Sequence, residues 1–128
     1  MFLFGKGPNI HVIDIFRNYL SKLNFNCVSS TDFDVQKRIT KNVNEQDICF
    51  IFTYSNLTKS MLEIYDDIKN RNTVLIIATS NVESPLFINS DYNFLIKNNE
   101  KILEDQTSSI ISFLTIVMQI LYLINYSK

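Results

Sequence analysis

The residues best suited to chemistry form a hydroxyl-rich turn at 53–58, with the sequence TYSNLT. An apolar run at 48–52 precedes it and is typical of a strand buried on both faces. Apolar residues then recur at helical spacing from 57 to 68. The first N–H groups of a helix lack partners and its dipole favours an anion there, while nearby hydroxyls can donate to phosphate oxygens. We therefore predict that this turn binds a phosphate group.

A second explanation of the same turn needs no ligand. Ser55, Asn56 or Thr58 could simply cap the following helix, because such side chains accept hydrogen bonds from its first N–H groups. On the residues alone, both interpretations stay open.

Another polar turn, Gly5–Asn9, follows an apolar stretch at 1–4 that we predict to be a strand. Glycine permits a positive φ or a close approach of the backbone to a ligand, and Pro8 suits a turn or a first helical turn. Lys6 and Lys59 are the cations nearest to the two turns, and each could neutralise a phosphate as a point charge. Each could equally be a solvated surface lysine.

The elements that must position these turns alternate between short apolar strands and helical patterns. Strands are predicted at 1–4, 24–30, 48–52, 73–78 and 92–96, helices at 10–23, 31–43, 57–71 and 107–126, a short turn or helical segment at 84–86, and a loop at 97–105. Thr31 with Asp34 resembles a capping box at the start of the second helix. This alternation indicates a parallel sheet covered on both faces. Its right-handed crossovers place the loops after the strands at one edge, where ligands of such sheets bind.

The turn at 53–58 resembles the S-x-S-G-x-T phosphate loop of sugar isomerase (SIS) domains. The segment 72–86, NTVLIIATSNVESPL, is similar to the family's VIAIT…SPLA strand and turn, and DYNFLI at 91–96 resembles its ADVVLxV strand. The segment 109–123 resembles the closing helix of SIS domains in RpiR-type transcriptional regulators. This ordered series covers nearly all the chain. It implies an α/β fold, a three-layer αβα sandwich with a five-stranded parallel sheet in the order 2-1-3-4-5.

The resemblance also implies which residues bind. The strand order reverses between the first and third strands, so Gly5–Asn9 and Thr53–Thr58 would flank the ligand crevice. Two family positions differ: Asn56 replaces the loop glycine, and Asn9 replaces the serine of the family's G-x-G-x-S loop. Asn tolerates a left-handed backbone better than most residues. The expected phosphosugar-binding residues are Thr53, Ser55, Asn56, Thr58, Asn9 and Gly7. Auxiliary candidates are Lys6, Lys59, Ser108 and Ser109, the two serines being helix caps or contacts to the sugar.

Two functions follow from this resemblance. The first is a phosphosugar-sensing domain, of the kind found in RpiR-type regulators. The alternative is a small aldose–ketose isomerase, which needs a base beside the carbon whose proton moves. The sole histidine is His11, and the glutamates are scattered among polar neighbours, so we assign no catalytic residue. A third possibility, given Asn9 and Asn56, is a degenerate domain kept only for association.

Composition bounds the remaining properties. The 128 residues fit a single domain, 1–128, with a net charge of −1 and neither a basic cluster nor a helix-turn-helix unit, so we expect no direct nucleic acid contact. Cys27 and Cys49 are expected to be free thiols in a reducing compartment. The sequence shows no signal peptide, so we expect a cytoplasmic protein. We also expect that it binds no metal and no cofactor. The longest apolar stretch, 110–124, is shorter than the ~20 residues that a membrane span needs.

Assembly is the last expectation. SIS domains usually have a helix before the first strand, and this sequence shows none. The closing helix is apolar nearly all round, which indicates burial on more than one side. We therefore predict a homodimer or a larger homo-oligomer formed through helical surfaces. A rival explanation is a fragment whose upstream segment would pack there.

Overall fold

The computed structural model describes residues 1–6, 9–53, 59–96, 100–103, 106–108 and 110–126, with the backbone alone for 100–103, 106–108 and 110. Its elements, in chain order, are β1 (Phe2–Gly5), α1 (Asn9–Lys22), α2 (Phe33–Ile39), the 3-10 turn η1 (Thr40–Asn42), β2 (Ile48–Phe52), α3 (Lys59–Ile68), β3 (Val74–Thr79), α4 (Pro85–Asn89), β4 (Tyr92–Leu95), β5 (Glu100–Leu103), β6 (Gln106–Ser108) and α5 (Ile110–Tyr126).

The main sheet has four parallel strands in the order β1-β2-β3-β4. A fifth strand was expected at 24–30, beside β1. That segment does lie there, but it contributes only a single parallel bridge between Phe2 and Val28. The expected strand order and fold class are thus confirmed, while the number of strands is four. The pairing stops after Val28 because the side chain of Gln36 occupies the next position along β1.

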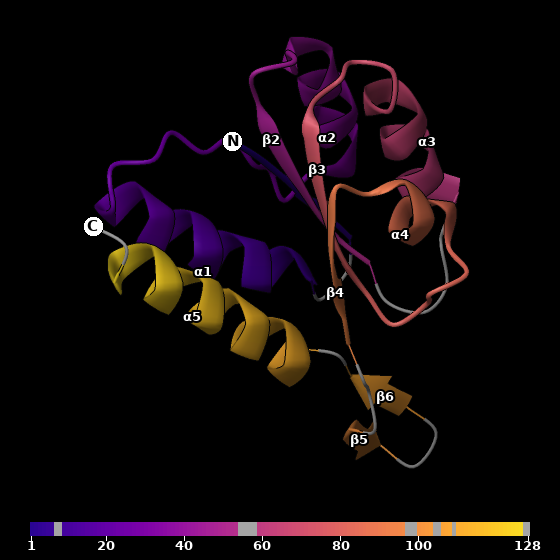
Figure 1. Cartoon of the computed structure of the whole chain (residues 1–128). Coiled ribbons are helices and arrows are strands. Elements are labelled where there is room, and N and C mark those ends of the chain that lie inside the picture. The colour runs from indigo at the N-terminus through magenta and orange to yellow at the C-terminus, as the bar shows by residue number, and fades with distance from the viewer. Residues whose placement is uncertain (7–8, 54–58, 97–99, 104–105, 109, 127–128) are drawn as a thin grey trace.

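Helices cover both faces of this sheet, as predicted. Successive strand side chains point to opposite faces. Figure 1 shows α1 and α5 side by side on one face and α2, α3 and α4 on the other. Phe4 of β1 and Ile51 of β2 join the core under α3, whereas Phe50 and Phe52 join the core under α1 and α5. The result is a three-layer αβα sandwich.

Aromatic rings link the α1–α5 layer to the sheet. Phe16 of α1 packs edge-on against Phe50, with ring centroids 5.1 Å apart. Phe113 of α5 packs edge-on against Phe52, with centroids 5.6 Å apart. Offset and edge-on rings of this kind stabilise beyond the apolar area that they bury. The closing helix is therefore fastened to the central strand β2 by Phe113.

Three local predictions were wrong. The loop expected at 97–105 contains β5, which forms an antiparallel hairpin with β6. The last helix begins at Ile110 rather than Thr107, because Thr107 and Ser108 belong to β6. The cap of α2 is Asp32 rather than Thr31: its Oδ1 accepts from the N–H groups of Asp34 at 2.8 Å and Val35 at 3.2 Å. A carboxylate there outcompetes the hydroxyl as an acceptor at the positive end of a helix.

Replacing Phe113 by Ala should test its role in fastening α5. The side chain is fully buried against β2, and such truncations leave a cavity that costs about 3–5 kcal/mol of unfolding free energy. Urea denaturation followed by circular dichroism measures the change. The matched control is Ile88→Ala, at an exposed position of α4, which should change stability by less than about 0.5 kcal/mol. Equal effects of the two changes would contradict the packing described.

Candidate functional site

The carboxyl ends of the four strands meet at one edge of the sheet. The register pairs Gly5 with Phe52, Phe52 with Ala78, and Thr79 with Leu95. Thr53, next after β2, is 4% exposed and donates its N–H to the carbonyl of Ala78 at 3.0 Å. The turns that follow β1 and β2 thus leave the sheet side by side, as the fold class requires.

Lys6 connects the first of these turns to α3. Its Nζ donates to Ser60 Oγ at 3.1 Å and lies 5.5 Å from the centroid of the Phe33 ring. Ser60 is the second residue of α3. The ammonium group therefore lies at the first turn of that helix, beside the place where the hydroxyl-rich turn ends.

Positive charge gathers at the start of α3. The helix begins with Lys59, its first turn holds no acidic residue, and Lys6 reaches the same turn. Cations are unfavourable at a helix N-terminus, where the unpaired N–H groups carry partial positive charge. An anion bound there would balance the positive charge of both lysines and accept hydrogen bonds from the first N–H groups of the helix.

The nearest acidic side chain on α3 is engaged elsewhere. Glu63 pairs with Lys37 of α2, Nζ to Oε2, at 2.8 Å. The hydrogen bond from Lys37 and its charge lower the pKa of Glu63, and the same contact raises the pKa of Lys37. The carboxylate of Glu63 is thus held as an ion-pair partner of α2, which leaves it a weak base.

The turn after β3 adds polar groups at the same edge. The N–H of Asn81 bonds Thr79 Oγ1 at 3.2 Å, and the N–H of Glu83 bonds Asn81 Oδ1 at 3.0 Å. Ser84 caps α4 by accepting from the N–H of Leu86 at 3.2 Å. The hydroxyl of Ser80 is buried and has no hydrogen-bond partner among the residues described. Buried polar groups are normally paired, so this oxygen stands out as available to a ligand.

The structure places only part of the predicted set. Thr53, Lys6, Lys59 and Asn9, the buried first residue of α1, lie at or next to the carboxyl edge or the start of α3. Ser108 lies in the β5–β6 hairpin. Ser55, Asn56, Thr58, Gly7 and Ser109 lie outside the described residues.

Sequence reasoning missed Gln36, which is wholly buried and hydrogen-bonded to Gly5. A glutamine in a short polar helix is usually solvated. The available signal was its spacing: Phe33 and Gln36 of α2 and Thr40, the first residue of η1, recur at helical spacing on the side that the structure packs inward.

Groups that could act as a base or nucleophile are few within the described residues. His11 is exposed on α1. Burial raises the pKa of the Cys49 thiol to about 11 and also raises that of the half-buried Cys27, and both cysteines are free. No group of three His, Cys, Asp or Glu in the part of the chain described could hold a metal ion. No helix among these residues is long and apolar enough to cross a membrane.

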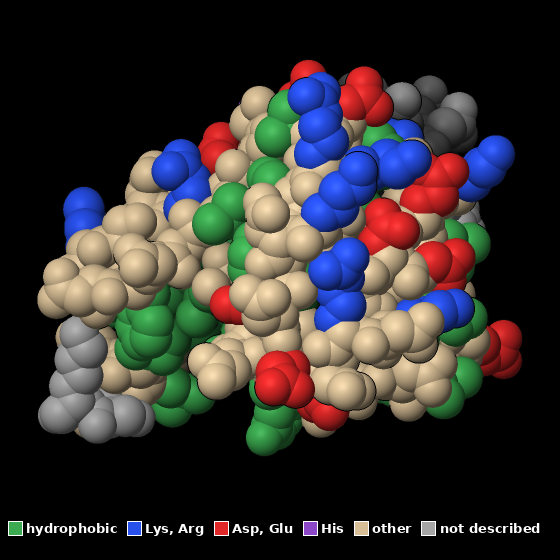
Figure 2. Space-filling model, turned by 90° about the horizontal axis from the view of Figure 1, so that it is seen from above, with side chains coloured by type: hydrophobic (Ala, Val, Ile, Leu, Met, Phe, Trp, Pro, Cys, Tyr) green, Lys and Arg blue, Asp and Glu red, His purple; other side chains and the backbone are tan. Residues whose placement is uncertain are grey.

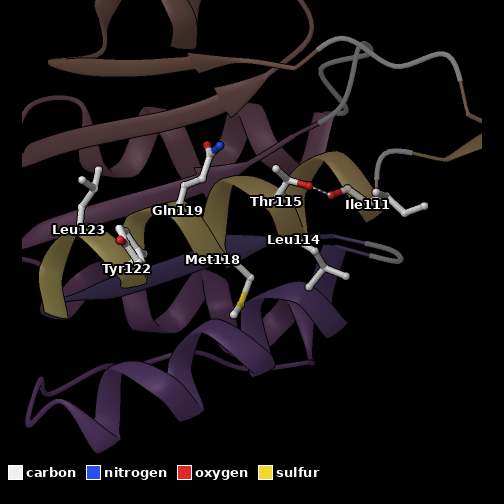
Figure 3. A pocket seen from close by; sticks show the side chains of 7 residues that line it. All are labelled: Ile111, Leu114, Thr115, Met118, Gln119, Tyr122 and Leu123. Atoms are coloured by element: carbon white, nitrogen blue, oxygen red, sulfur yellow. Dashed lines mark hydrogen bonds between the residues drawn. The ribbon is translucent and has the colours of Figure 1, made fainter. Parts of the chain in front are cut away.

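An apolar hollow lies on the outer face of α5. It is a groove of about 710 Å³ lined by Ile111, Leu114, Thr115, Met118, Gln119, Tyr122 and Leu123. Figure 3 shows these side chains in two rows along the helix. Figure 2, a view from above Figure 1, shows basic and acidic side chains interspersed, with hydrophobic ones gathered at the end where α1 and α5 lie. The groove's lining suits an apolar partner better than a phosphate.

Comparison with known proteins places this geometry in a family context. The family model of the SIS domain matches residues 1–123. The sugar isomerase domain of an RpiR transcription factor from Sphaerobacter thermophilus has a TM-score of 0.85 at 13% identity, covering 98% of this chain and 69% of that one. The Vibrio vulnificus NanR protein complexed with ManNAc-6P has a TM-score of 0.78 at 17% identity, covering 98% and 49%.

A further similar structure is that of a hypothetical protein from Methanococcus jannaschii, whose crystal structure infers a function of 3-hexulose-6-phosphate isomerase for that protein. It has a TM-score of 0.69 at 19% identity, with 94% of this chain and 67% of that one covered. No curated protein sequence matches this chain. At these identities the similar structures establish the fold alone.

The two thiols should differ in reactivity towards iodoacetamide at pH 8. Cys49 is fully buried with its pKa raised to about 11, so it should react only after unfolding. Cys27 is half-buried, so it should react slowly in the native protein. Mass spectrometry of timed samples, with a Cys27→Ser variant to isolate Cys49, measures both rates. Native labelling of Cys49 as fast as Cys27 would show that the β2 core is more open than described.

Proposed function

The chain belongs to the SIS domain family, and we propose that it binds a sugar phosphate as the effector-sensing domain of a cytoplasmic RpiR-type transcriptional regulator. The observation that carries the proposal is the contact of Lys6 with Ser60, which brings the turn after β1 to the N-terminus of α3. Lys6 and Lys59 then lie at the start of α3, whose first turn has no acidic residue, and a helix N-terminus beside two cations is suited to a dianionic ester.

In the proposed complex the phosphate lies at the start of α3. The hydroxyls of Thr53, Ser55 and Thr58 would donate to its oxygens, with Asn56 shaping the turn. Lys6 and Lys59 would balance its charge. Gly7 and Asn9, with Ser80 across the crevice, would contact the sugar from the facing turns. Any DNA-binding unit would lie outside 1–128, because the chain carries no basic cluster.

An isomerase using the same pocket is the second candidate, and its support is the similar structure from Methanococcus jannaschii. Proton transfer between adjacent carbons needs a positioned base. Among the described residues, Glu63 is held by Lys37 and His11 is exposed on α1. A binding role is therefore the better supported of the two.

We also propose a homodimer or larger homo-oligomer that forms through α5. This helix has 17 residues and no charged one, and its outer side chains Ile111, Met118, Tyr122, Leu123 and Tyr126 are exposed. Large exposed apolar patches on single chains usually mark interaction sites. A second copy is the partner argued for, because identical charged surfaces would repel each other across a two-fold axis, whereas uncharged ones do not.

The shape of α5 supports the same partner. The groove lies between two rows at i, i+4 spacing, 111/115/119/123 and 114/118/122 (Figure 3). Side chains in such a row form a ridge, and the ridge of one helix packs into the groove of another at about −50°. The α5 helix therefore presents both the ridge and the groove that a symmetric contact needs.

A thermal-shift screen tests the binding role. The probes are ManNAc-6P, glucosamine 6-phosphate and glucose 6-phosphate, each compared with its parent sugar. A bound ligand at about a hundred times its Kd stabilises by about 2.7 kcal/mol, so the melting temperature should rise with the phosphate ester and not with the sugar. NMR of each hit for aldose–ketose conversion separates sensor from isomerase.

Variants of the turn refine this prediction. Ser55→Ala and Thr58→Val should each weaken binding by about tenfold or more, since a hydrogen bond to a charged group contributes about 1.5–3 kcal/mol. Ser90→Ala, in the turn after α4, is the control and should leave affinity unchanged. Unchanged affinity in both turn variants would exclude the hydroxyl-rich turn as the phosphate site.

The oligomer is tested by light scattering over a dilution series. The wild type should have the mass of a dimer or larger at high concentration. Tyr122→Arg and Leu123→Arg should give monomers, because each buries a charge in an apolar contact. The control Ile88→Arg, 67% exposed on α4, should keep the wild-type mass. A monomer at every wild-type concentration would contradict the proposal and favour a segment of a longer chain as the occupant of the groove.

A further inference from the structure

The carboxamide of Gln36 is buried between the end of β1 and residue 30. Gly5 N donates to Gln36 Oε1 at 3.2 Å, and Gln36 Nε2 donates to Gly5 O at 2.8 Å and to Ser30 O at 2.9 Å. Two residues earlier, Leu3 N donates directly to Val28 O. In a continued parallel ladder, Gly5 N would next donate to residue 30. The side chain of Gln36 has taken the place of that backbone pairing.

This arrangement fixes the first residue of the turn from two sides. Both hydrogen-bonding groups of Gly5 are held by Gln36. On the other side the chain is tightly packed: a Cβ at Gly5 would lie 2.5 Å from Ile13 Cδ1 and 3.4 Å from the carbonyl oxygen of Phe52. Because the carbonyl of Gly5 belongs to the peptide that begins Lys6, the direction in which Lys6 leaves the sheet is set as well.

The same helix also contacts the side chain of Lys6. Phe33 lies three residues before Gln36 on α2, so the two side chains share a face. The Lys6 ammonium lies 5.5 Å from the centre of the Phe33 ring and donates to Ser60 Oγ at 3.1 Å. One face of α2 therefore holds both the backbone before Lys6 and the charged end of its side chain.

The α2 helix is in turn tied to α3. Lys37 pairs with Glu63 at 2.8 Å, and Thr40 Oγ1 lies 3.2 Å from Asp67 Oδ2. Because α2 contacts both Lys6 and α3, these contacts set where Lys6 lies relative to the N-terminus of α3 without a ligand. The ammonium group is thus in place before any ligand arrives.

We propose that Gln36 and Phe33 are positioning residues that hold Lys6 at the start of α3 for an incoming phosphate. The inference rests on the proposed phosphosugar site and assigns α2 a role in it. A group held in its bound position loses less freedom on binding, so affinity increases. Neither residue touches the ligand, and each acts through Lys6.

A double-mutant cycle on the full chain tests this. The probes are inorganic phosphate and ManNAc-6P, titrated by calorimetry well below the melting temperature. Lys6→Met should weaken affinity by about tenfold, the value of one charge-assisted contact. Gln36→Met and Phe33→Leu should each weaken it several-fold when Lys6 is present. In the Lys6→Met background, neither should weaken it further, because the group that they position has been removed.

Controls separate positioning from loss of stability. Val43→Ala, at a buried position of the α2–α3 core away from Lys6, should lower the melting temperature and leave affinity unchanged. Phe33→Leu keeps the buried hydrogen bonds of Gln36 and so provides the test if Gln36→Met fails to fold. Equal losses with and without Lys6, or no loss in either variant, would overturn the positioning role alone. Absence of wild-type binding to both probes and to the sugar phosphates of the screen would overturn the proposed function itself.

Discussion

The parallel pairing of β1 with β2 is the constraint on which the rest of this protein depends. It places Gly5 opposite Phe52, so the turns that leave the two strands must emerge together. A shift by one residue would send Phe4 and Ile51 to the wrong face and expose one of the two cores. The packing of both helical layers therefore enforces the alignment of the carboxyl edge at which the proposed ligand site lies.

This alignment is also incomplete on one side of β1. The bridge at Val28 ends the backbone ladder, and the carboxamide of Gln36 continues it for one more residue. An edge with unpaired backbone groups attracts other strands, and a buried one is costly. Gln36 removes both problems with a single side chain. Because the Gln36 side chain takes the place of a neighbouring strand, the backbone N–H and carbonyl of Gly5 are bonded by the helix α2.

Most of the fold could be predicted from the sequence because its signals are local. Ile48–Phe52 and Val74–Thr79 are continuous apolar runs, and α1 and α3 have apolar residues at helical spacing. The remaining features depend on tertiary context. Whether 24–30 pairs as a strand depends on Gln36, which lies only six residues beyond Ser30 but reaches its place between the two segments by bonding Gly5, 31 residues away along the chain. The β5–β6 hairpin lies in a polar stretch with weak periodicity.

The candidate site likewise has features that could be predicted from the sequence and features that could not. The resemblance of the turn at 53–58 and the place of Thr53 at the strand edge followed from motif and fold class. The contacts of Lys6 with Ser60 and Phe33 did not, because sequence spacing carries no information about a pair so far apart along the chain. Lys6 is exposed, as a lysine in a turn usually is, and only the neighbouring elements show which groups its ammonium contacts.

The carboxyl edge of the sheet and the apolar face of α5 are joined by direct packing. Phe52 is the last residue of β2 and precedes the hydroxyl-rich turn, and its ring contacts Phe113 of α5. The exposed rows of α5 lie on the outer side of the same helix (Figure 3). A ligand can change an interface only through a difference in its affinity for two arrangements of the protein. The contact of Phe52 with Phe113 is one direct packing route between the two regions, because close-packed side chains do not deform freely and a shift of one must be matched by the other.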